Sequence, residues 1–269
     1  MAALSGTRIV SIALNVPGPV AVARLAAAGA GVVKIEPPAG DPLETMSPTW
    51  YAELTASVEV VRVDLKSPGG QAALAAMLSG AALLVSSQRP SALGRLGLGA
   101  SRLAADFPAL RHLNIVGERA RPEHAGHDLT YQAARGLLTD RLPATLLADL
   151  LGAEQALSAA LLLLAGPAGG RAEVGLADSL DALSAPARHG LTGAGELLGG
   201  GLAAYGVYPA REGHVAVAAL EPHFRRRLYD ALDRPIDAPL ADAFTGRTAG
   251  DWEAWARERD LPIVAVRAR

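Results

Sequence analysis

The sequence contains no cysteine. This absence excludes disulfide bonds, thiolate metal sites, CxxC redox chemistry and a cysteine nucleophile. Aromatic residues make up only 4% of the chain although half of its 269 residues are hydrophobic, so alanine, leucine and valine supply most of the apolar surface. A chain of this length is long enough for one large or two modest domains with a sizeable core.

The sequence also lacks an excess of charge of either sign. It has 25 basic and 27 acidic residues, for a net charge of −2. Such a balance gives no general attraction to nucleic acid or to an anionic membrane, and we expect neither as a partner. Lysine occurs only at Lys34 and Lys66. The preference for arginine elsewhere is typical of a GC-rich genome and is not evidence of phosphate binding.

Long hydrophobic runs and a basic leader are missing as well. The longest apolar run covers residues 156–165 and is interrupted by Ser158. It is shorter than the roughly 20 residues that a membrane-spanning helix needs. The first residues do not form a basic segment followed by an apolar one, as a secretory signal does. We therefore expect a soluble cytoplasmic protein.

Strand-like and helix-like segments alternate in the first part of the chain. The apolar patterns predict strands at residues 8–14, 32–35, 82–86 and 113–116, and helices at residues 20–28, 71–78, 91–96 and 100–107. This alternation predicts an α/β fold: a Rossmann-like, doubly wound parallel sheet with right-handed crossovers. Gly29 and Gly31 follow the first helix rather than the first strand, so they do not match a dinucleotide-binding loop. We interpret Gly29 as a helix C-cap.

The remainder of the chain predicts a second, smaller α+β domain. Two further helices are expected at residues 145–165 and 178–187, and residues 190–201 hold six glycines, as a linker would. After the linker we expect strands at residues 215–220 and 263–266, and helices after Glu221 and around Trp252 and Trp255. We place the large domain at residues 1–189, the linker at 190–204 and the small domain at 205–269.

Several short motifs occur in a fixed order along the chain. They are Val-Val-Lys-Ile-Glu-Pro-Pro (residues 32–38), Val-Asp-Leu-Lys-Ser-Pro-Gly (63–69), Gln-Arg-Pro-Ser-Ala-Leu-Gly-Arg-Leu-Gly-Leu-Gly (88–99), Ala-Gly-His-Asp-Leu-Thr-Tyr (125–131) and Leu-Glu-Pro (220–222). In order and spacing the chain resembles the family III CoA-transferases, from residue 4 to about residue 262. The α-methylacyl-CoA racemase branch of that family is the most similar, because the histidine of the Gly-His-Asp motif is retained.

The resemblance implies that His127, Asp149 and Glu221 are catalytic. In an acyl-CoA racemase or epimerase, His127 and Asp149 act as two bases on opposite faces of the α-carbon of a 2-methylacyl-CoA thioester. Glu221 supports the histidine through a hydrogen bond. We expect His127 and Asp149 to face each other across a cleft at the carboxyl edge of the parallel sheet.

Other interpretations of these residues come from the local sequence. A lone histidine such as His127 is often structural, and its pairing with His124 in a metal site lacks a second pair of ligands, so we expect no metal. Asp149 is surrounded by apolar residues and fits an N-cap of the following helix. Glu221 fits an acid at a helix start, where the helix dipole favours it.

The resemblance assigns the binding of coenzyme A to Arg89, Arg95, Lys34, Lys66 and Tyr131. The four cations are also compatible with ordinary surface positions. No cofactor is expected beyond the coenzyme A moiety of an acyl-CoA substrate.

Two departures from the family pattern broaden the choice of function. Residues 55–61 hold no cation where the family carries an Asn-Arg-x-Lys-Arg segment, and residues 260–264 lie near the end of this sequence whereas family members continue with a segment that returns to the large domain. We therefore expect a homodimer that dissociates on dilution. Two alternatives to the racemase remain: a CoA-transferase that uses Asp149 as a nucleophile, and a degenerate, non-catalytic member of the family.

Overall fold

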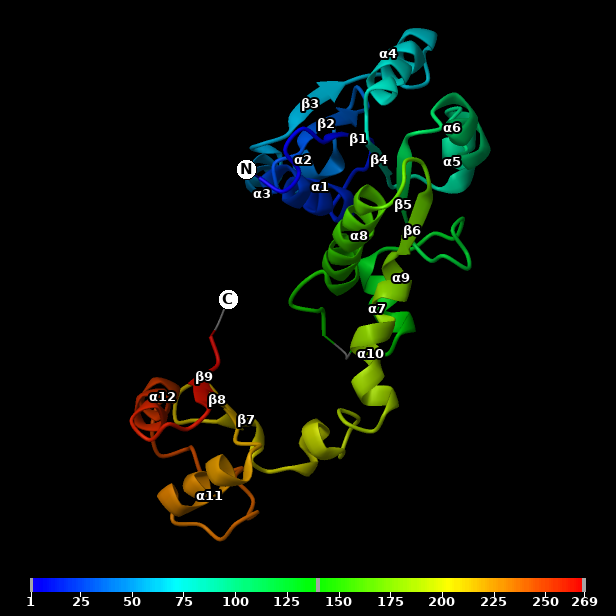
Figure 1. The fold of residues 1–269 in the computed structure, drawn as a ribbon. Helices are drawn as coiled ribbons and strands as arrows, with labels where there is room; N and C mark the ends of the chain where they lie inside the picture. Colours follow the sequence, from blue (N-terminus) through cyan, green and yellow to red (C-terminus); the bar gives the residue numbers. More distant parts are fainter. Residues whose placement is uncertain (1, 139–140, 268–269) are drawn as a thin grey trace. The chain divides into compact units, whose positions relative to one another are not determined.

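The structure is a computed structural model that describes residues 2–138 and 141–267. The chain forms two compact units, which divide after Ser184 (Figure 1).

The first unit is built on a six-stranded sheet. Its strands are β1 (Arg8–Ser11), β2 (Gly31–Glu36), β3 (Glu59–Arg62), β4 (Leu83–Ser86), β5 (Arg111–Val116) and β6 (Arg171–Gly175). All neighbours pair in parallel, in the order β3-β2-β1-β4-β5-β6. This is the strand order of a doubly wound sheet, which confirms the predicted Rossmann-like fold. The order reverses between β1 and β4, and ligands bind at this position in such sheets.

Helices cover both faces of the sheet. The helices of the first unit are α1 (Pro17–Ala27), α2 (Pro42–Met46), α3 (Pro48–Thr55), α4 (Pro68–Ser79), α5 (Pro90–Arg95), α6 (Ala100–Asp106), α7 (Asp128–Ala134), α8 (Leu147–Ala165) and α9 (Leu176–Ser179), and α10 (Asp181–Arg188) crosses the division after Ser184. The first five begin with proline, which suits the first helical position because its missing N–H has no partner there. Gly29 has a φ of +99° directly after the cap residue of α1, so its predicted role at the end of that helix is confirmed.

The two faces of the sheet bury separate apolar clusters. One joins Ile9, Leu83 and Ile115 to the inner sides of α1 and α8, and the other joins Val10 and Leu84 to α4, α5 and α6 (Figure 1). Side chains of successive strand residues point to opposite faces, so one strand serves both clusters.

Helix α8 has small residues on its inner side. Ala148, Gly152, Ala153 and Ala156 are buried there, and a Cβ at Gly152 would lie 2.3 Å from Leu176 Cδ2. Among the described residues, one helix, α8, has the length and the apolar composition that could cross a membrane. Its packing against α1 and the sheet is typical of the core helix of an α/β domain.

The second unit is a small antiparallel sheet packed with helices. It contains a π-helical turn (Leu197–Gly201), β7 (Tyr205–Pro209), β8 (His214–Ala218), α11 (Pro222–Ala231), α12 (Ala249–Arg257) and β9 (Ile263–Ala265), with strand order β7-β8-β9. Trp252 stacks edge-on against both Phe244 and Trp255, with ring centroids 5.2 and 5.0 Å apart. These aromatic rings form the centre of its core with Leu228 and Tyr229. The predicted smaller α+β fold is confirmed.

Candidate active site

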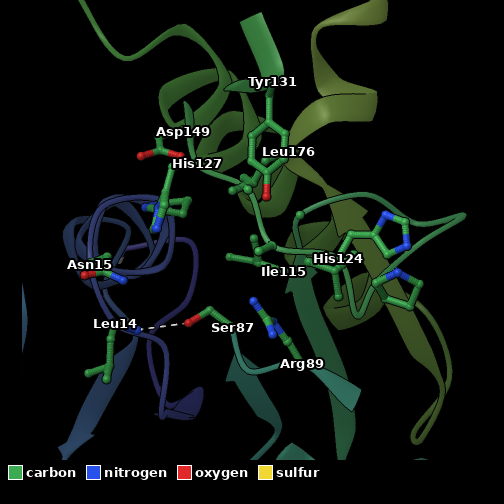
Figure 2. A pocket seen from close by; sticks show the side chains of 16 residues that line it. Leu14, Asn15, Ser87, Arg89, Ile115, His124, His127, Tyr131, Asp149 and Leu176 are labelled. Carbon is green, nitrogen blue, oxygen red and sulfur yellow. Dashed lines mark hydrogen bonds between the residues drawn. The ribbon is translucent and has the colours of Figure 1, made fainter. Parts of the chain in front are cut away.

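A cavity of about 240 Å³ opens at the carboxyl ends of β1, β4, β5 and β6 (Figure 2). It is lined by Leu14, Asn15, Pro17, Ser87, Arg89, Ile115, Val116, Gly117, Pro122, His124, Ala125, Gly126, His127, Tyr131, Asp149 and Leu176. The cavity spans the position where the strand order reverses. The structure thus brings His127 and Asp149, which are 22 positions apart in the printed sequence, to one cavity at the expected edge of the sheet.

The Gly-His-Asp motif is shaped around the ring of Tyr131. A Cβ at Gly126 would lie 2.4 Å from Tyr131 Cε1, and one at Gly117 would lie 2.2 Å from the Tyr131 hydroxyl. Both positions therefore need glycine to make room for the ring. Figure 2 shows the Tyr131 hydroxyl pointing into the cavity. Burial, and then the charge of Asp149, raises the pKa of Tyr131, so this hydroxyl is a hydrogen-bond donor to anything in the cavity.

His127 precedes helix α7 and occupies its N-cap position. Thr130 fixes the backbone of His127: its Oγ1 accepts from the His127 amide at 3.0 Å and donates to the His127 carbonyl at 2.8 Å. The exposed imidazole lines the cavity next to Asp149 in Figure 2. Hence the sequence Gly-His-Asp-Leu-Thr-Tyr places a histidine and a tyrosine on the same wall.

Asp149 lies in the first turn of α8, with its side chain half-buried. The N-cap of this helix is Leu146, so the predicted N-cap role of Asp149 is wrong. Burial raises the pKa of Asp149 to about 6; the charge of Asp128 adds to this effect and His127 opposes it. A carboxyl group with this pKa is mostly ionised at neutral pH, yet it also accepts a proton readily.

Polar groups from the ends of β1 and β4 form the opposite wall. The Leu14 amide donates to Ser87 Oγ at 3.1 Å, which ties the two strand ends together (Figure 2). Asn15 has a left-handed φ of +66°, a conformation that asparagine tolerates better than most residues. Exposed Arg89 supplies a cation to the cavity, whereas Arg95, at the end of α5, is exposed but outside the lining.

Lys34 occupies a different environment from the one expected. It is 1% exposed, and its ammonium group bonds to the buried carboxylates of Glu36 and Asp41, at 2.7 Å from Asp41 Oδ2. The Tyr51 hydroxyl also donates to Glu36, at 2.8 Å. A lysine neutralised in this way is not available to a phosphate, so the coenzyme A contact predicted for Lys34 does not fit its position.

A second, more apolar hollow of about 140 Å³ adjoins the cavity. It is lined by Ile12, Leu14, Ile35, Pro37, Val63, Asp64, Leu65, Lys66, Gln88 and Leu96, and Leu14 is common to both linings. The three motifs at residues 32–38, 63–69 and 88–99 therefore converge on this hollow. Lys66 is exposed at its edge.

Glu221 belongs to the second unit, where it occupies the N-cap of α11 and is exposed. This position agrees with an acid at a helix start. Its support for His127 stays a prediction. Within residues 2–138 and 141–267, no group of three or more histidine, aspartate or glutamate side chains is arranged to hold a metal ion.

The sequence model of the family described as CoA-transferase family III matches residues 4–269, almost the whole chain. The chain belongs to CoA-transferase family III. Two curated relatives are cinnamoyl-CoA:phenyllactate CoA-transferase of Clostridium sporogenes and succinyl-CoA:(R)-benzylsuccinate CoA-transferase subunit BbsE of Thauera aromatica. The first is 32% identical, and the match covers 49% of this chain and 35% of the relative. The second is 33% identical, and the match covers 45% of this chain and 33% of the relative. The match thus spans about a third of the length of these relatives.

Solved structures support the same fold for this family III chain. A hypothetical protein (Rv3272) from Mycobacterium tuberculosis superposes with a TM-score of 0.86 at 20% identity, over 100% of this chain and 85% of that one. A CAIB/BAIF family protein from Brucella suis superposes with a TM-score of 0.81 at 19% identity, over 99% and 84%. At these identities the likeness shows the fold alone.

Proposed function

We propose that this chain is a CoA-transferase that moves coenzyme A from an acyl-CoA to a second carboxylic acid, with Asp149 as the nucleophile. The observation that carries the proposal is the Asp149 carboxylate, half-buried on the cavity at the carboxyl edge of the sheet. The names of the relatives, which are CoA-transferases, favour this function over the racemase that the sequence motifs suggested.

The chemistry needs one ionised carboxylate in a place of low polarity. The Asp149 carboxylate attacks the thioester carbonyl of the donor, which forms a mixed anhydride and releases the coenzyme A thiolate. The thiolate then attacks the Asp149 carbonyl, so the donor acid leaves and an Asp149–CoA thioester remains. An acceptor carboxylate reverses these steps and departs as the new acyl-CoA. Asp149 is regenerated and no proton is consumed.

The two neighbouring hollows offer places for the two ends of coenzyme A. The smaller, apolar hollow next to Lys66 suits a flat adenine ring with a cation for its phosphate, and the larger cavity suits the thioester. Arg89 is placed on the larger cavity to meet a carboxylate or phosphate group. Tyr131 donates a hydrogen bond to the thioester or anhydride oxygen.

A racemase is the second candidate, and one observation favours it. His127 lies on the same cavity as Asp149, and its charged form opposes the rise in the pKa of that carboxyl. An imidazole beside a carboxyl of pKa about 6 is an acid–base pair of the kind that proton transfer at an α-carbon requires. Transfer of coenzyme A does not require this histidine.

One reaction mixture distinguishes the two candidates. The protein is incubated in D₂O with a 2-methylacyl-CoA donor and a different carboxylic acid, and new thioesters and α-deuteration are followed by mass spectrometry and NMR. The transferase predicts a new acyl-CoA that survives in His127→Ala and is lost in Asp149→Ala. His124→Ala is the matched control, because it removes another histidine of the same lining. Deuteration without transfer, lost in both His127→Ala and Asp149→Ala, overturns the proposal in favour of the racemase.

Failure of both reactions favours the degenerate, non-catalytic member. We also propose that the protein is a homodimer of the cytoplasm, as the family resemblance suggests. Light scattering over a concentration series tests the dimer, and a monomer at every concentration contradicts it.

A further inference from the structure

Asp128, the first residue of α7, bridges two helices with its side chain. Its carboxylate is 5% exposed. One oxygen, Oδ1, accepts from the backbone amides of Ala148 at 2.7 Å and Asp149 at 3.2 Å. The other, Oδ2, accepts from Gln132 Nε2 at 2.5 Å, one turn along α7. The carboxylate thus joins α7 to the first turn of α8.

These bonds supply α8 with the cap that its own sequence does not provide. The N-cap residue of α8 is Leu146, whose aliphatic side chain has no atom that accepts a hydrogen bond. The first amides of a helix need acceptors from elsewhere. Asp128 meets this need for Ala148 and Asp149 from a position 20 residues upstream.

We propose that Asp128 is a positioning residue for Asp149: it fixes the backbone that carries the nucleophile and places a negative charge beside its carboxyl group. This role rests on the proposed function of Asp149. Two consequences follow from the one side chain. The bonds hold Asp149 toward the cavity, and the charge makes ionisation of Asp149 harder.

The negative charge of Asp128 agrees with the raised proton affinity of the Asp149 carboxyl group. The pKa of Asp149 is raised to about 6, first by burial and second by Asp128. A carboxylate that holds its proton more tightly is also a stronger nucleophile once it is ionised. Asp128 therefore makes Asp149 more reactive at neutral pH, where most of it is already ionised.

Besides Asp128, the titratable groups that act on Asp149 or lie beside it are His127 and Tyr131, on the same segment as Asp128. Arg89 and His124 line the same cavity. The charged and titratable groups of the other elements packed on α8 are engaged elsewhere: Arg24 of α1 with Glu154, Asp178 of α9 with Arg119, Arg171 with Glu173 in β6, Arg111 of β5 with the Gly166 carbonyl, and His112 of β5 with Ser86. Asp128 is thus the anionic neighbour of Asp149 among the described residues.

Asp128→Asn separates the charge from the bonds. The asparagine oxygen still accepts from the two amides, and Gln132 accommodates the new NH₂ group by turning its own amide, because Gln132 Oε1 is buried without a partner among the described residues. Asp128→Ala removes charge and bonds together. Glu154→Gln is the matched control: it removes one negative charge from the same helix, at a residue paired with Arg24.

The readout is the titration of Asp149 by ¹³C NMR of aspartate-labelled protein without substrate, with Asp149→Asn to assign the signal. We expect Asp149 to titrate at lower pH in Asp128→Asn than in wild type, and at the wild-type pH in Glu154→Gln. The pH dependence of CoA transfer moves in the same direction, and Asp128→Ala loses transfer at every pH. Titration of Asp149 at the same pH in Asp128→Asn and wild type overturns the proposal.

A second measurement needs no variant, so it applies even if the variants of Asp128 fail to fold. In the wild-type protein, hydrogen exchange at the Ala148 and Asp149 amides should be slow, because Asp128 accepts from both. Exchange of these amides at the rate of exposed ones contradicts the cap. Neither the titration nor the exchange uses activity, so a protein without CoA transfer still tests the role of Asp128.

Discussion

The raised pKa of Asp149 predicts that this residue costs the protein stability. In the unfolded chain the carboxyl ionises near its ordinary pKa of 3.8, and in the folded chain near 6. Between these values the unfolded state loses its proton first, so the free energy of unfolding falls as the pH rises. Below pH 3.8 both states are protonated and there is no cost; above pH 6 the cost is complete.

The magnitude follows from the difference between the two pKa values, 6 − 3.8, or about 2. Each unit corresponds to about 1.36 kcal/mol, so the cost is at most about 3 kcal/mol. Asp149 is only half-buried, and solvent screening reduces this to roughly 1–2 kcal/mol. Asp149→Asn removes the charge and keeps the shape. We expect this variant to be more stable than wild type by that amount at pH 8 and by little or nothing at pH 4.

The assay is urea unfolding followed by far-UV circular dichroism at a series of pH values from 4 to 8. Glu154→Gln is the control on the same helix, because its carboxylate is exposed and paired with Arg24; its effect should not vary between pH 5 and pH 8. An Asp149→Asn variant no more stable than wild type at pH 8 refutes the reasoning. Gain of stability on removal of a functional group is the general mark of a strained site.

Two other substitutions test packing and charge around the site. Gly126→Ala should lower activity, and it should lower the free energy of unfolding by about 1–3 kcal/mol, because the new Cβ lies 2.4 Å from the Tyr131 ring. Gly94→Ala is the control, because there is open space around Gly94. Equal effects of the two substitutions contradict this account. Lys34→Met should destabilise the protein by about 3–5 kcal/mol in thermal or urea unfolding, because it removes the ammonium group shared by two buried carboxylates and leaves Glu36 with the more distant Arg62, at 3.9 Å. Lys66→Met should leave stability nearly unchanged, and a Lys34→Met variant as stable as wild type is evidence against the buried network.

The central strands of the sheet could be predicted from the sequence, and its edges could not. Strands β1 and β4 carry consecutive apolar residues, at positions 9–10 and 83–85, because both faces of the sheet are buried there. The edge strands β3 and β6 were not predicted. They contain Glu59, Arg62, Arg171 and Glu173 on solvent-facing positions, so their patterns resemble surface loops.

The shared cavity of His127 and Asp149 was predictable, because open α/β sheets bind ligands at the carboxyl ends of their strands. The role of Asp128 could not be predicted. Its partners lie about 20 residues away, and they are backbone amides, which every residue except proline has. The predicted contact of Lys34 with coenzyme A does not fit the structure, although the sequence contains a pattern that indicates its burial. Lys34 and Glu36 are two apart on a strand and therefore share a face, where they form a pair. A charged pair inside an apolar strand points to burial rather than to ligand binding.

The most direct test of the proposed function is to trap the covalent intermediate on Asp149. The protein is mixed with an acyl-CoA donor, treated with hydroxylamine, digested and analysed by peptide mass spectrometry. A CoA-transferase forms an Asp149 thioester or anhydride, and hydroxylamine converts either one to a hydroxamate on the peptide that contains Asp149. We predict this product in wild type and in His127→Ala, and its loss in Asp149→Ala. An unmodified Asp149 peptide from protein that exchanges the α-proton of the same donor would contradict the account and assign the site to proton transfer.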